Sequence, residues 1–142
     1  MEQRPPCSAY KETYGLLYFA RMLDKIRLKH GELLHPDYFE NLGQGFDGRC
    51  CRFLGIKYSA LRERVLAGGT DEEILDWCLQ HGTRPNEEQI FIFSSFLRKR
   101  GWCDDEKTTN ALGAFKTGSG LAHRSDIVTF FDFYELDEGR LP

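Results

Sequence analysis

The stretch 16-LLYFARMLDKIRLKH-30 decides the fold class of this chain. When residues are projected at about 100° per step, one stripe of the wheel contains Leu16, Phe19, Leu23, Ile26 and His30. Because a helix repeats every 3.6 residues, this spacing predicts an amphipathic helix over Leu16–His30 that ends near Gly31. Such a helix must bury its apolar stripe, so the rest of the chain has to supply the surfaces that cover it.

Caps and glycines predict further helices downstream. The predicted helical segments and their N-caps are 48–55 with Asp47, 60–69 with Ser59, 71–82 with a Thr70–Glu73 capping box, and 87–102 with Asn86. The alternation within 90-IFIFSSF-96 would also fit a strand, but the length of the segment and its cap favour a helix. After Asp104 we expect one more helix interrupted at Gly113, and then a final helix with Ser125 as its cap.

These segments indicate an all-α fold, a compact irregular bundle of about five to six helices. A chain of 142 residues is close to the commonest domain size, so we expect a single domain over residues 1–142. Within it, residues 1–13 are expected to form a loosely ordered N-terminal arm.

Composition excludes several classes of function. The 19 basic and 22 acidic residues give a net charge of −3 without a block of like charges, which argues against nucleic-acid binding. No apolar run approaches the ~20 residues of a membrane-spanning helix. Five cysteines without C-x-x-C spacing or a secretory signal favour reduced thiols and a cytoplasmic location. The four histidines lack metal-binding spacing, so we expect neither a metal nor a cofactor.

The first helix carries Arg21, Asp24 and Arg27 beside its apolar stripe, at one-turn spacing. Asp24 can pair with either arginine and hold its guanidinium in place, and a guanidinium fork suits a carboxylate or a phosphate. One interpretation is that the set joins this helix to a neighbour, through acids such as Asp126 or Asp132. The other is that one arginine is left to bind an anionic ligand.

A glycine-rich loop at 41-NLGQGFDGRCCRF-53 is the second candidate site. Glycines before a helix start can gather backbone N–H groups around an anion, although this loop lacks the lysine of a P-loop. The simpler interpretation is a tight turn capped by Asp47. Arg49 and the helix start could lower the pKa of Cys50 or Cys51, while a buried and inert cysteine is the alternative.

Five blocks of the sequence carry a resemblance to a known family: GLLYFARMLDKIRLKHGEL, NLGQGFDGRCCRFLGI, AGGTDEEILDWCLQHG, FLRKRGW and DIVTFFDFYELDEGR. Through these blocks the sequence resembles a family of small bacterial proteins, a domain of unknown function with the series number 5069. The resemblance covers about Tyr14 to Arg140, with the weakest match over 104–122. It implies a compact, mainly helical, soluble bacterial protein and brings no activity or cofactor with it. These blocks contain the candidate residues Arg21, Asp24, Lys25, Arg27, Asp47, Arg49, Cys50 and Cys51.

Two hypotheses of function follow. The first is a non-enzymatic binding module, in which Arg21, Arg27 and Arg49 surround an anionic small molecule or an acidic group of a protein partner. The alternative is a small enzyme in the same region, with an Asp as general base or a Cys as nucleophile beside an arginine. A dimer formed through the phenylalanine-rich final segment is also compatible with the sequence.

Overall fold

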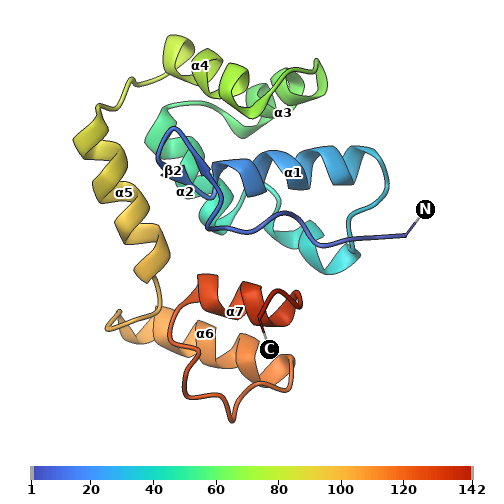
Figure 1. Ribbon diagram of the computed structural model, residues 1–142, viewed down its shortest axis with the longest axis vertical. Coiled ribbons are helices and arrows are strands. Elements are labelled where there is room, and N and C mark those ends of the chain that lie inside the picture. Colours follow the sequence, from blue (N-terminus) through green and yellow to red (C-terminus); the bar gives the residue numbers. More distant parts are fainter. Residues whose placement is uncertain (1, 142) are drawn as a thin grey trace. The chain divides into compact units, whose positions relative to one another are not determined.

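The computed structural model describes residues 2–141, and these residues are mostly helical (Figure 1). The predicted helical character is therefore confirmed, although a two-stranded sheet means that the fold is not strictly all-α. Over the described range there are seven α-helices, more than the five to six predicted. The elements are β1 (Glu12–Thr13), β2 (Leu16–Leu17), α1 (Phe19–His30), the 3-10 helix η1 (Pro36–Asn41), α2 (Gly45–Leu54), α3 (Tyr58–Leu66), α4 (Asp71–His81), α5 (Glu87–Lys99), α6 (Glu106–Gly118) and α7 (Phe130–Asp137). The described residues form two compact units, of which the first ends at Ser94 and the second begins at Ser95.

The first helix begins later than its apolar period predicts. Leu16 and Leu17 form strand β2, which pairs antiparallel with β1. Tyr18 then takes a left-handed conformation, with φ of 72°, and α1 starts at Phe19. The cause lies far away in the sequence, because the Ser94 hydroxyl accepts a hydrogen bond from the Leu17 N–H and donates one to the Gly15 carbonyl. Tertiary contacts here override the local helical pattern.

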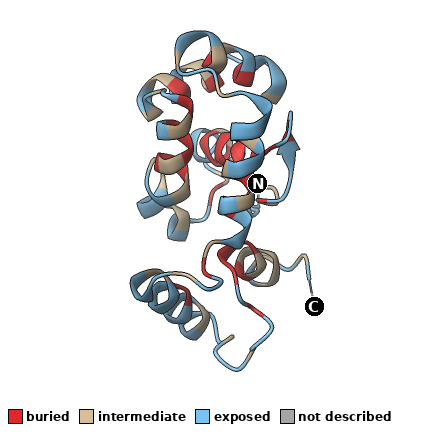
Figure 2. Cartoon of the chain, turned by 90° about the vertical axis from the view of Figure 1, so that its left-hand side faces the viewer, coloured by how far each residue is buried: buried red, intermediate tan, exposed pale blue. Residues whose placement is uncertain are grey.

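Helix α1 lies at the centre of the first unit and contacts α3 and β1. Phe19, Leu23 and Ile26 of the predicted stripe are buried, while His30 at the end of the helix is exposed. Buried residues follow one face of the helices, and exposed residues cover the opposite face (Figure 2). The apolar spacing of the quoted stretch thus identifies the part of the core that α1 contributes.

The caps of the next helices were predicted with mixed success. Thr70 and Glu73 form the expected capping box at the start of α4. Asp47 is not an N-cap, because α2 begins two residues before it with Gln44 at the cap position. Likewise α3 includes Ser59 and has Lys57 at its N-cap, without a side-chain hydrogen bond there.

Helix α5 begins as predicted, since Asn86 and Gln89 exchange side-chain to backbone hydrogen bonds of 2.8 Å each. In the second unit, α6 continues through Gly113, where a break was expected. The final helix starts at Phe130 with Thr129 as its cap, so the prediction of Ser125 as the cap was wrong. Lys116 supplies the reason, because its ammonium donates to the carbonyls of Arg124 and Ile127 and holds this segment as a loop against α6.

Candidate functional site

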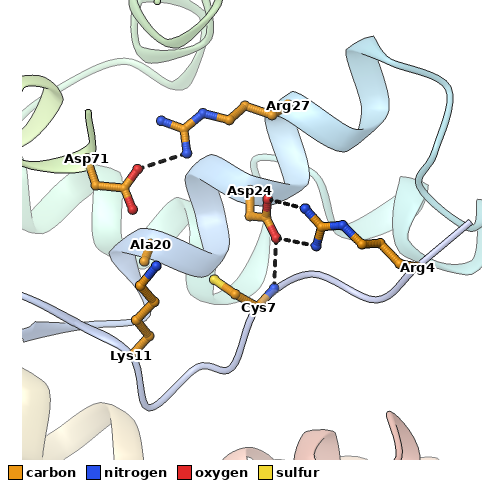
Figure 3. Close-up of a pocket in the computed structure, with 7 residues that line it drawn as sticks. All are labelled: Arg4, Cys7, Lys11, Ala20, Asp24, Arg27 and Asp71. Atoms are coloured by element: carbon orange, nitrogen blue, oxygen red, sulfur yellow. Dashed lines mark hydrogen bonds and ion pairs between the residues drawn. The ribbon is translucent and has the colours of Figure 1, made fainter. Parts of the chain in front are cut away.

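The N-terminal segment runs along α1 and borders with it a partly open pocket of about 190 Å³ (Figure 3). Several backbone hydrogen bonds fix this segment, among them Arg4 N–H to the Leu33 carbonyl and Tyr18 N–H to the Ala9 carbonyl. The pocket lies entirely within the first unit. Its lining consists of Arg4, Cys7, Lys11, Ala20, Asp24, Arg27 and Asp71.

Asp24 fastens the N-terminal segment to α1. Its carboxylate accepts two hydrogen bonds from the Arg4 guanidinium, at 2.9 and 3.0 Å, and a third from the Cys7 N–H at 2.9 Å. Burial alone would raise the pKa of Asp24, but the hydrogen bonds from Arg4 and Cys7 outweigh it and lower the pKa. The sequence suggested Arg21 or Arg27 as the partner of Asp24, and the partner in the ion pair with Asp24 is Arg4 instead.

Arg27 reaches across to the start of α4. Its Nη1 lies 2.8 Å from Oδ1 of Asp71, and 36% of the Arg27 side chain stays exposed. The Nε and Nη2 of Arg27 donate no hydrogen bond to any residue within 2–141, and neither does Oδ2 of Asp71 accept one there. The ion pair thus fixes the position of the Arg27 guanidinium. It leaves the Nε and Nη2 donors of Arg27 and the Oδ2 acceptor of Asp71 without hydrogen bonds to the described residues.

Lys11 adds a third cation from the turn that precedes β1. Its ammonium makes no hydrogen bond and no ion pair with the residues that the structure describes. In Figure 3 the Lys11 side chain extends toward Ala20 on α1, into the space between the N-terminal segment and the helix. Lys11 is therefore a positive charge at the pocket, and residues 2–141 supply no counter-ion to it.

Cys7 carries the only thiol in the pocket lining. Burial raises its pKa, as does the charge of Asp24, and the opposing charges of Lys11 and Arg21 do not cancel this effect. At neutral pH the group is accordingly a thiol, which can donate a weak hydrogen bond but is a poor nucleophile.

The comparisons with known proteins concern nearly the whole chain. The family model described as domain of unknown function DUF5069 matches residues 3–140. The chain belongs to the DUF5069 family. All residues that line the pocket lie inside the matched range. No curated protein matches this DUF5069 sequence.

The predicted site residues of this DUF5069 chain separate into two groups. Asp24 and Arg27 line the pocket, whereas Arg21, Asp47, Arg49 and Cys50 do not. Arg21 is buried on α1, and its Nη1 donates a 3.2 Å hydrogen bond to the Cys7 carbonyl. Arg21 thus helps to hold the N-terminal segment against α1 through this hydrogen bond.

Asp47 belongs to a buried polar cluster with Tyr18 and Lys25. Its side chain is fully buried, and its Oδ1 lies 2.7 Å from the Lys25 ammonium and 2.7 Å from the Tyr18 hydroxyl. Oδ2 accepts a 3.0 Å hydrogen bond from the Gly43 N–H. The glycine-rich loop therefore turns its N–H toward an internal carboxylate, which joins α2 to α1.

Cys50 and Cys51 are buried on α2. Burial raises the pKa of Cys50 well above its ordinary value and that of Cys51 to about 11. The predicted lowering by Arg49 and the helix start is thus opposed by desolvation, and both groups are thiols at neutral pH.

Sequence reasoning missed Arg4, Lys11 and Asp71. Arg4 and Lys11 lie in a segment that was expected to be loosely ordered, and Asp71 was considered only as part of a helix start. The one local signal is the Pro5–Pro6 pair, which restricts the backbone to an extended form and stiffens the segment after Arg4.

Two further searches of the described residues gave negative results. No helix in residues 2–141 has both the length and the apolar character needed to cross a membrane. In the same range, no three His, Cys, Asp or Glu side chains are grouped so that they could hold a metal ion.

Proposed function

We propose that this chain is a binding module for a small anion, and that the anion binds in the pocket between the N-terminal segment and α1. The observation that carries the proposal is the Lys11 ammonium, which has no partner among the described residues and lines the same pocket as Arg27. An anion there would meet a lysine and a guanidinium with unused N–H donors. Carboxylates and phosphates are the groups that such donors recognise.

The charge balance of the pocket supports an anionic ligand. Arg4, Lys11 and Arg27 supply three positive charges, and Asp24 and Asp71 supply two negative ones. Both oxygens of Asp24 are already occupied by Arg4 and the Cys7 N–H. One positive charge therefore remains to be balanced, and it lies on the side of Lys11 and Arg27.

The proposal modifies the site that the sequence suggested. Of the three arginines expected to surround the ligand, it retains Arg27, and it adds Arg4 and Lys11. The glycine-rich loop is not part of the proposed site, since its Gly43 N–H is bonded to Asp47.

Binding is favoured over catalysis by the state of the candidate reactive groups. A nucleophilic cysteine needs a lowered pKa, but the pKa values of Cys7, Cys50 and Cys51 are raised. A general base works best with a pKa near the working pH, and the pKa of Asp24 is lowered. We therefore propose no reaction for this pocket.

The proposal is tested by titrating the protein with sodium propionate and with inorganic phosphate, following backbone amide shifts by NMR. We expect millimolar affinity for at least one of them and shifts that concentrate at residues 4–11 and around Arg27. Lys11→Met should weaken binding about fivefold, the upper end for a partly exposed ion pair. The matched control is Lys107→Met on α6, an exposed lysine that does not line the pocket. Equal effects of the two variants, or the absence of any binding, would refute the proposal.

A further inference from the structure

We propose that the anion is a small 2-hydroxycarboxylate, a refinement that rests on the proposed function. In this arrangement the ligand carboxylate binds Lys11 and the open N–H groups of Arg27. The neighbouring hydroxyl donates a hydrogen bond to Oδ2 of Asp71. Lys11 and the remaining N–H donors of Arg27 then have the ligand carboxylate as their partner, and Oδ2 of Asp71 has the ligand hydroxyl.

Asp71 supplies the acceptor that defines the hydroxyl position. Its Oδ1 is bonded to Arg27 at 2.8 Å, and only 16% of its side chain is exposed. Its Oδ2 accepts no hydrogen bond from the residues that the structure describes. This oxygen is reached by solvent at the pocket, where a ligand hydroxyl can take the place of a water molecule. A ligand with a donor beside its negative group satisfies this oxygen, and a simple carboxylate does not.

The charge balance selects a hydroxyl over an ammonium as that donor. The five charged residues of the lining leave one positive charge, which one carboxylate neutralises. A zwitterionic amino acid brings no net charge, so it would leave the positive charge of the lining unbalanced. A phosphate, with a charge of about −1.5 to −2, would more than neutralise the single positive charge and leave the site negative.

The pocket has a volume of about 190 Å³ and is partly open to solvent. Ala20 forms the wall on α1, where any larger side chain would narrow the space. A small acid of about three carbons, with six non-hydrogen atoms, can be placed there with both its carboxylate and its hydroxyl in the pocket.

The test compares three ligands of three carbons that differ only at the second carbon: L-lactate with a hydroxyl, propionate with hydrogen and L-alanine with an ammonium. Dissociation constants are measured by NMR titration of the unmodified protein, so the comparison does not depend on a variant that folds. We expect lactate to bind about tenfold more tightly than propionate, the effect of one hydrogen bond to a charged acceptor. Alanine should bind more weakly than lactate.

A pair of variants assigns the effect to Asp71. Asp71→Asn keeps an oxygen for Arg27 and replaces the acceptor with an NH₂ group, so the preference for lactate over propionate should fall to about unity. The control Glu72→Gln removes a charge from the adjacent exposed position of the same helix start and should keep the preference.

The outcomes separate this inference from the proposed function. Equal binding of lactate and propionate to the pocket would overturn the hydroxyl assignment and leave the anion site intact. Tighter binding of alanine than of lactate would overturn the charge argument. Failure of lactate, propionate and inorganic phosphate to bind would refute the site itself.

Discussion

Replacing Lys25 with methionine is expected to destabilise the fold strongly. The ammonium of Lys25 lies 2.7 Å from Oδ1 of Asp47, and the exposed fractions of the two side chains are 5% and 0%. Lys25→Met keeps much of the apolar stem but leaves the Asp47 carboxylate buried without its counter-ion. The remaining donors to that carboxylate are the Tyr18 hydroxyl and the Gly43 N–H.

The size of the effect follows from the burial of the charge. Removing one partner of a buried ion pair costs about 3–5 kcal/mol, because the other charge stays desolvated. Since domains of this size are stable by about 5–15 kcal/mol, Lys25→Met should remove about a fifth or more of the stability of the first unit. Adding Asp47→Asn to Lys25→Met removes the uncompensated charge, so the double variant should be more stable than Lys25→Met alone.

The assay is urea unfolding followed by far-UV circular dichroism, with the free energy of unfolding extrapolated to water. Lys107→Met, an exposed lysine on α6, is the control and should change the stability by less than about 0.5 kcal/mol. A loss below about 1 kcal/mol for Lys25→Met would refute the reasoning, as would a double variant that is less stable than Lys25→Met.

Two further perturbations test other parts of the first unit. Gly43→Ala should lower the unfolding free energy by about 1–3 kcal/mol. Gly43 has φ of 75°, and a Cβ there would lie 2.9 Å from Cδ1 of Tyr58. An unchanged midpoint of thermal unfolding would contradict this expectation. Asp24→Asn should reduce stability at pH 7, and the deficit should shrink as the pH falls below the ordinary Asp value of 3.8. The pKa of Asp24 is lowered in the fold, so its stabilising effect is present above the unfolded pKa and is lost as the pH drops through the folded one. Urea unfolding at pH 7 and pH 2.5 measures this, and an equal deficit at both would count against the role of Asp24.

Local signals predicted the helices well where they act alone. The Thr70–Glu73 capping box and the reciprocal bonds of Asn86 and Gln89 need only residues three apart, and both mark real helix starts. The start of α1 could not be predicted in this way. Its position depends on Ser94, which is 77 residues from Leu17 in the chain and offers no signal in the first segment.

The candidate site, too, could be predicted where local spacing decides and not where residues far apart in the chain make contact. The wheel projection placed Asp24 and Arg27 side by side on α1, and both line the pocket. It could not identify their partners, because Arg4 is 20 residues from Asp24 and Asp71 is 44 from Arg27. Helix periodicity reports only neighbours three or four residues apart.

The two hydrogen bonds between Ser94 and the β1–β2 hairpin have a consequence for folding during translation. The segment from Gly15 to Leu17 cannot form its hydrogen bonds with Ser94 until that residue, the last of the first unit, has been synthesised. Before this serine is present, the hairpin is held by the pairing of β1 with β2, and an isolated pair of strands is only marginally stable in water. We therefore expect this hairpin to become fully ordered only after the first unit has been synthesised as far as Ser94.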